Sequence, residues 1–126
     1  MAARKPSSFT YAKLKKLALS LKLPNVIETT SWGQPCLKAH GKLWVWWSPH
    51  EDVPVFKVPV ETRDMLIELD PERFFVTAHY KPHGLILVRP EKLEAAWAKK
   101  TLIESWRAMA PKKLLKAYDE KSKEKT

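Results

Sequence analysis

The sequence predicts an α+β fold with a central antiparallel β-sheet and with N-terminal, middle and C-terminal helices packed on one of its faces. Apolar residues repeat at helical spacing near both ends of the chain. Between them, short runs rich in threonine, tryptophan and valine alternate with glycine and proline, which is typical of antiparallel strands. With a length of 126 residues and a 44% hydrophobic content, residues 1–126 are predicted to form a single domain around one core.

The first half of the chain predicts one helix followed by four strands. Residues 1–8 are predicted to be a disordered leader, after which Thr10 caps a helix that ends before Pro24. A three-residue turn at His40-Gly41-Lys42 is predicted to join the second strand to the third. The four strands are predicted near residues 27–32, 35–39, 43–48 and 54–58.

The second half predicts helices separated by two further strands. A helix is expected over residues 61–69, and the strands are expected near residues 74–77 and 85–89. The apolar pattern beyond Pro90 fits either one curved helix or two joined helices, because Thr101 and Glu104 have the spacing of a capping box. Pro111 can open one more helix, to which Leu114, Leu115 and Tyr118 would contribute the docked side, and residues 120–126 are predicted to be a frayed basic tail.

The net charge of +9 is located at the two ends of the chain. Residues 1–22 contain six basic and no acidic residues, and residues 111–126 contain six lysines and three acids. The remaining eleven bases and eleven acids cancel between residues 23 and 110. Such ends attract polyanions through salt-sensitive electrostatics, although basic ends that only keep a protein soluble would give the same pattern.

Several classes of function find no support in the sequence. The single Cys36 cannot form an internal disulfide, and no leader peptide or membrane-spanning run is recognisable, so a cytoplasmic protein without membrane association is predicted. Only three glycines occur, far apart, which excludes a glycine-rich phosphate loop. Cys36 lies between Pro35 and Leu37 in a predicted strand and is interpreted as an inert thiol.

The stretch "FFVTAHYKPHG", residues 74–84, is the one most similar to an active-site loop. His79 lacks a nucleophile and a carboxylate at any recognisable spacing, and Pro82 makes a helical pairing of His79 with His83 improbable. We therefore interpret the stretch as a structural corner in which Tyr80 and His79 form hydrogen bonds to the backbone. An alternative is a small-molecule pocket lined by His79, Tyr80 and tryptophans. No catalytic residue, metal or cofactor is predicted.

The strands that flank Gly41 predict two chemically different faces. With the predicted turn, Leu37, Ala39, Leu43, Val45 and Trp47 point toward the helices. The opposite face then holds Cys36, Lys38, His40, Trp44 and Trp46, with Val55 and Lys57 from the next strand. Tryptophans interleaved with lysines are what a single-stranded nucleic acid needs, because bases stack on the rings and phosphates meet the ammonium groups. The alternative is that another element or a second subunit covers this face.

Three stretches resemble the MmcQ/YjbR-like family of small bacterial proteins: "TTSWGQPCLKAHGKLWVW" (29–46), "VFKVPVETRDMLIELDPERFFVTAHY" (55–80) and "SWRAMAPKKL" (105–114). Where such sequences tend to read Thr-Pro-His-Tyr, this chain has Ala78 in place of the proline. The resemblance implies a compact α+β fold of the frataxin-like or double-wing kind. It also implies DNA binding, a label that rests largely on fold analogy and brings no established catalytic residues.

The sequence as a whole predicts a non-enzymatic domain that binds nucleic acid, with DNA as the partner that the resemblance implies. The basic ends would contact phosphates, and Trp44 and Trp46 could stack on bases. The lysines expected to take part are Lys13, Lys16, Lys38, Lys42 and Lys57. The alternatives are a protein-interaction module that forms a homodimer through the tryptophan-rich face, and a small-molecule binding protein with the His79 and Tyr80 pocket.

Overall fold

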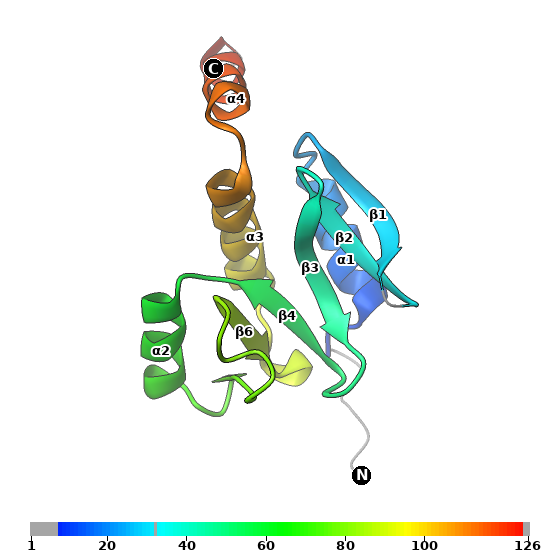
Figure 1. Ribbon diagram of the computed structural model, residues 1–126, viewed down its shortest axis with the longest axis vertical. Helices are drawn as coiled ribbons and strands as arrows, with labels where there is room; N and C mark the ends of the chain where they lie inside the picture. The colour runs from blue at the N-terminus through cyan, green and yellow to red at the C-terminus, as the bar shows by residue number, and fades with distance from the viewer. Residues whose placement is uncertain (1–7, 32, 125–126) are drawn as a thin grey trace.

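The computed structural model describes residues 8–31 and 33–124, in which six antiparallel strands form one sheet in the order β1-β2-β3-β4-β6-β5 (Figure 1). The strands are β1 (Val26–Ser31), β2 (Gln34–Ala39), β3 (Lys42–Ser48), β4 (Val53–Lys57), β5 (Phe74–Phe75) and β6 (Leu85–Val88). The helices are α1 (Tyr11–Ser20), α2 (Val60–Leu69), α3 (Ala95–Met109) and α4 (Lys112–Glu124), with a 3-10 turn at Pro90–Lys92. The predicted α+β fold is confirmed, and the predicted leader lies outside the described residues except for Ser8, which is buried.

Cross-strand pairing gives the sheet two distinct faces. One row of partners contributes its side chains to the core beneath the helices, and its members are Leu37, Val45, Phe56 and Ile86. The next row points the other way, and its members are Cys36, Trp46, Val55 and Leu87. We call the first side the helix face and the second side the outer face. In Figure 1 the outer face of β1 to β3 is turned to the viewer, and α1 lies behind these strands.

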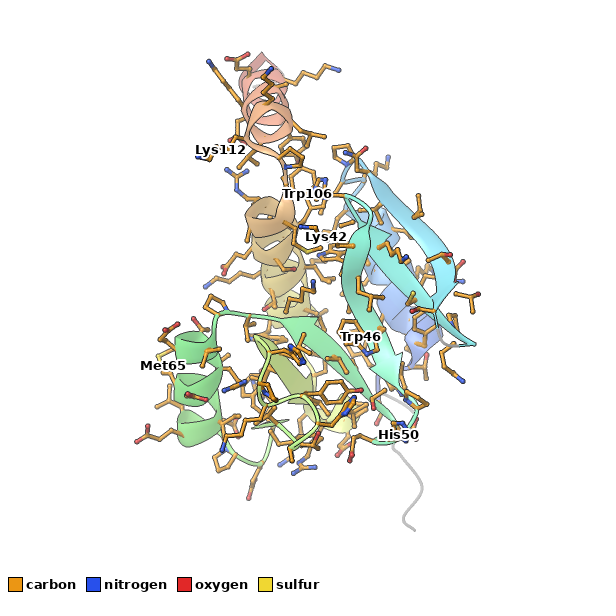
Figure 2. The ribbon with its side chains drawn as sticks, in the orientation of Figure 1. Lys42, Trp46, His50, Met65, Trp106 and Lys112 are labelled. Atoms are coloured by element: carbon orange, nitrogen blue, oxygen red, sulfur yellow. The ribbon has the colours of Figure 1, made fainter. Side chains whose placement is uncertain are left out.

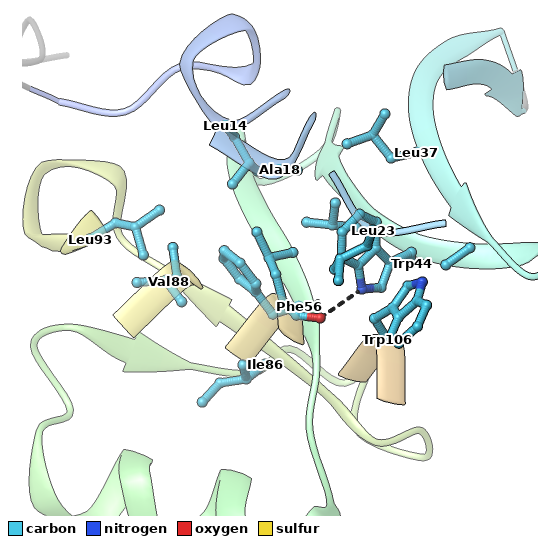
Figure 3. Close-up of a cluster of buried hydrophobic side chains, with 14 of the residues drawn as sticks. Leu14, Ala18, Leu23, Leu37, Trp44, Phe56, Ile86, Val88, Leu93 and Trp106 are labelled. Carbon is cyan, nitrogen blue, oxygen red and sulfur yellow. Dashed lines mark hydrogen bonds between the residues drawn. The ribbon is translucent and has the colours of Figure 1, made fainter. Parts of the chain in front are cut away.

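The main core lies between the helix face and helices α1 and α3. Leu14 and Ala18 of α1 and Leu102 and Trp106 of α3 are all at most 1% exposed there (Figure 3). Helix α1 begins where the sequence predicts, because the Thr10 hydroxyl accepts a hydrogen bond from the backbone N–H of Lys13. A core of this kind holds the sheet rigid from one side, so the outer face is left to interact with something else.

The β2–β3 hairpin differs from the predicted hairpin in two compensating ways. Its turn has two residues, His40 and Gly41, whose φ values of 55° and 80° are those of a type I′ turn, and Ala39 pairs directly with Lys42. A β-bulge then follows, because the pairing passes from Lys38 with Leu43 to Leu37 with Val45. The shorter turn and the extra residue cancel, and the predicted pairing of Leu37 with Val45 is restored.

The bulge makes the prediction for Trp44 wrong. Trp44 is the extra residue, and its indole turns to the helix face instead of the outer face, where it is 0% exposed. Its Nε1–H group donates to the Leu102 carbonyl at 3.2 Å, the dashed line in Figure 3, and also to the Ser105 hydroxyl at 2.9 Å, both on α3. Trp44 is therefore a core residue that cannot stack on a ligand. His40 also leaves the predicted face, since its ring stacks on Trp106 of α3 with centroids 5.0 Å apart.

For the C-terminal region, the structure decides between two predicted alternatives and corrects one prediction. The region after Pro90 contains one continuous helix, α3, which is the first alternative, and Thr101 is a buried interior residue of it and not a cap. Helix α4 continues to Glu124, although the sequence predicted a frayed tail from residue 120. The start of α4 is held by contacts with α3: Tyr118 packs on Trp106, and Arg107 donates two hydrogen bonds to the Asp119 carboxylate.

Candidate nucleic-acid interface

The outer face of the sheet contains bases but no acids at the strand positions that point outward. Lys38 pairs with Leu43 two residues beyond Cys36, and Lys57 follows Val55 at the same spacing, so both lysines share this face. Glu28 belongs to the opposite face, where it contacts Lys15 and Tyr11 of α1. Among the described strands, the outer face therefore has a purely positive set of side-chain charges.

Three lysines gather at the end of the sheet next to the His40-Gly41 turn. Lys38 and Lys57 point to the outer face, whereas Lys42 pairs with Ala39, a buried residue of the helix face, and so extends from the helix side of the strand end. Lys38, Lys42 and Lys57 come from three neighbouring strands, β2, β3 and β4. Within the described residues, none of the three forms an ion pair, whereas Lys15, Lys92 and Arg107 each have a carboxylate partner. We call these three residues the lysine cluster. In the described part of the chain, no acid is paired with its charges.

The electrostatics of Lys57 show that the cluster is repulsive. Burial lowers the pKa of Lys57, and the positive charge of Lys42 lowers it further. A lysine that is partly withdrawn from water and faces a second cation is destabilised in its charged form. The folded domain therefore keeps these like charges close together at a cost in free energy. An anion bound between Lys42 and Lys57 would offset the repulsion between the two ammonium groups. It would also replace part of the hydration that the Lys57 ammonium loses on burial.

A groove of about 670 Å³ lies on the same face, next to the lysine cluster. Its floor includes Cys36, Leu43 and Trp46 of the sheet, and its wall includes Tyr80. Figure 2 shows Lys42, Trp46 and His50 in succession along β3 and the turn that follows it, which places the cluster at one end and His50 toward the other. Leu43 joins the two features, because it pairs with Lys38 and also lines the groove.

The 76–84 loop that forms the wall is fixed to the sheet by two buried side chains. Tyr80 is 8% exposed and packs with Val55 and Leu87 in a second hydrophobic cluster, where its hydroxyl donates to the Ser48 hydroxyl at 3.2 Å. Arg63 of α2 is 3% exposed, and its Nη1 donates to the carbonyls of Lys81 at 2.9 Å and His83 at 2.8 Å. The stretch is therefore an ordered corner that packs on the outer face of the sheet.

His79 and Tyr80, the two residues predicted for a pocket, both line the groove. The His79 ring meets the Tyr80 ring edge to face, with centroids 4.7 Å apart. The Trp46 ring is tilted against the Tyr80 ring, with centroids 6.4 Å apart. Burial raises the pKa of Cys36, and the nearby Lys38 charge opposes this only in part. The thiol is therefore not activated, and the groove offers aromatic surfaces rather than a nucleophile.

The structure separates other predicted site residues from this face. Lys13 and Lys16 lie on α1 in the helix layer, so they do not join Lys38, Lys42 and Lys57 in one surface. Helix α4 lies closer to the cluster, because Tyr118 and His40 both contact Trp106. Lys42, Trp106 and Lys112 accordingly appear at the same end of the molecule in Figure 2. The basic C-terminal end can thus extend the lysine cluster, while the basic α1 cannot.

The groove residues that the sequence did not predict include Gln34, His50 and His83. The density of histidines in residues 74–84 was a signal for His83, but His50 and Gln34 become neighbours of this stretch only through the pairing of β2, β3 and β4. Within the described residues, no group of three His, Cys, Asp or Glu side chains could hold a metal ion. None of the described helices combines the length and apolar character needed to cross a membrane.

An antiparallel sheet with helices on one face and a basic, grooved outer face defines a small α+β domain. The family model described as YjbR matches residues 21–108, and the chain belongs to this family. The chain is also similar to a solved structure, that of the Deinococcus radiodurans protein DR2400 with its DUF419 domain. The TM-score is 0.65 at 16% sequence identity, over 84% of this chain and 81% of the other, which shows a shared fold. No curated protein matches the chain.

Proposed function

We propose that this domain binds single-stranded nucleic acid, with phosphates held by Lys38 and Lys57 on the outer face and by Lys42 at the adjoining edge of the sheet. The observation that carries the proposal is the lysine cluster itself, three bases from adjacent strands without an acidic partner among the described residues. Like charges held together in a fold cost stability, so a cluster of this kind is best explained by an anionic ligand that compensates them.

The spacing of the cluster suits a chain of phosphates better than one small anion. Adjacent strands lie about 4.8 Å apart, so lysines on β2, β3 and β4 extend over roughly 10 Å across the sheet. The positive end of α4 continues in the same direction, and the net charge of +9 would speed the approach of any polyanion. A single strand is favoured over a duplex because the adjacent groove can accept a base only if that base is unpaired.

A titration with a short fluorescent single strand at several salt concentrations tests the proposal. If three phosphates are neutralised, the logarithm of the affinity should fall with the logarithm of salt with a slope of about −2, since each contact contributes about 0.7. The same sequence as a duplex is the control, and it should bind more weakly. Absence of binding at low salt, or tighter binding of the duplex, would contradict the proposed function.

A further inference from the structure

We infer that the outer-face groove is a pocket for one unpaired nucleobase of the bound strand. This inference rests on the proposed function and adds that two neighbouring sites bind different parts of the nucleic acid. The lysine cluster holds the backbone, and the groove beside it receives a flat heteroaromatic ring. The inference concerns binding only and involves no chemical step.

The lining of the groove selects an aromatic, uncharged group. Trp46 and Tyr80 supply ring surface, and Leu43, Pro35, Pro49 and Leu85 supply apolar contact. Within the described residues, no Lys, Arg, Asp or Glu lines the groove. A phosphate placed there would lose its hydration without gaining a fixed positive charge. An uncharged base would stack on the rings and would lose much less hydration free energy.

The polar groups of the groove fit the edge of a base. Gln34 offers an amide with two donors and an acceptor, Ser31 offers a hydroxyl, and the imidazoles of His50, His79 and His83 offer further donors and acceptors. These groups are exposed or half-buried at the rim, while the aromatic surface lies deeper. Pockets of this size with apolar walls and a few polar groups are typical of sites for flat organic ligands.

The groove lies close enough to the lysine cluster for one strand to contact both, with its phosphates on the lysines and a base in the groove. Lys38 lies two residues after Cys36 on β2, and Lys57 lies two residues after Val55, the partner of Trp46. Both steps lead from the groove toward the cluster along the same face, a distance of about 7 Å for two residues of a strand. A strand whose phosphates contact the lysines can therefore place a neighbouring base over Trp46.

The experiment compares a short single strand with an abasic strand of equal length, in which every base is replaced by a tetrahydrofuran spacer. Stacking of one base contributes about 1 to 3 kcal/mol, so the base-containing strand should bind the wild-type protein about 5- to 150-fold more tightly. The double variant Gln34→Ala and His79→Ala removes an amide that can bond the edge of the base and a ring that packs on Tyr80, so it should lose part of this preference and keep its affinity for the abasic strand. Both residues are exposed, so the variant should fold normally.

Thr30→Ala is the matched control, because Thr30 is exposed on β1 but lies on the opposite side of the strand from Thr29, the partner of Cys36. It should leave the preference unchanged. Equal affinity of the wild-type protein for both strands, or an unchanged preference in the double variant, would overturn the base pocket and leave the lysine contacts standing. If neither strand binds, the proposed function fails, and the base pocket fails with it.

Discussion

Lys57 connects the stability of the free domain to its proposed ligand. Because burial and the Lys42 charge lower its pKa, the protonated side chain is less stable in the folded domain than in the unfolded chain. This cost is present below the folded pKa and disappears as the pH rises through that value toward the unfolded pKa of about 10.4. Lys57 thus contributes charge for binding at a small expense of stability.

Lys57→Met should raise the free energy of unfolding near pH 7, by less than about 1 kcal/mol because much of the side chain is in contact with water. The gain should shrink as the pH is raised toward about 10, since the wild-type lysine then loses its proton. Urea unfolding at the two pH values measures it. Lys99→Met, at an exposed position on α3, serves as the control and should show no such gain. A gain for Lys57→Met that is the same at both pH values would refute the electrostatic origin.

Trp44 shows that the alternating pattern of a strand does not by itself determine to which face of the sheet a side chain points. Strict alternation along β3 predicts that Trp44 and Trp46 share a face, and this holds only in a strand without a bulge. Trp46 does point to the outer face as predicted. It lies beyond the bulge, where the predicted pairing of Leu37 with Val45 is present. The orientation of Trp44 is decided by two acceptors on α3, Leu102 and Ser105, which are distant in sequence.

The 76–84 loop depends on a helix that does not belong to the groove. Arg63 of α2 bonds two loop carbonyls from a buried position, and its Nε lies 3.1 Å from the exposed Asp64 carboxylate. Because Lys81 and His83 belong to the loop that forms the groove wall, α2 holds this wall in place without lining the groove. Arg63 is therefore a positioning residue for the proposed base pocket.

Arg63→Met should destabilise the protein by about 2 to 4 kcal/mol, because two hydrogen bonds from a charged donor are lost and two carbonyls are left without it. Hydrogen exchange should accelerate most for the amides of residues 78–85. Asp64→Ala removes only the exposed ion pair and should cost less than about 1 kcal/mol. Faster exchange spread evenly over the whole sheet, with no excess in the loop, would contradict the anchoring role.

The elements themselves were predictable because each has a local cause. The Thr10 cap, the acidic first turn of α2 with Glu61, and the proline and glycine boundaries of the strands are all readable from neighbouring residues. The type I′ turn and the bulge in the β2–β3 hairpin were not predicted, because their effects on the register cancel and leave the same apolar alternation. The predicted pocket of His79, Tyr80 and tryptophans shares His79, Tyr80, Trp46 and Trp47 with the groove, and the other lining residues converge only through tertiary pairing.

At the scale of the whole molecule, the proposed function depends on where the positive charges lie. The sequence places the surplus of positive charge at the two chain ends. The fold puts the α1 lysines in the helix layer, while Lys38 and Lys57 lie on the outer face. Net charge alone would attract a polyanion to any of these surfaces. The central claim is therefore that position on the outer face, rather than total charge, determines binding.

Two triple variants that lower the net charge equally, from +9 to +6, test this claim most directly. One replaces Lys38, Lys42 and Lys57 with glutamine, and the other replaces Lys13, Lys16 and Lys99. Affinity for a short fluorescent single strand at about 0.1 M salt should fall at least about 10-fold in the first variant and far less in the second. Equal losses in the two variants, or a larger loss in the second, would contradict an outer-face site.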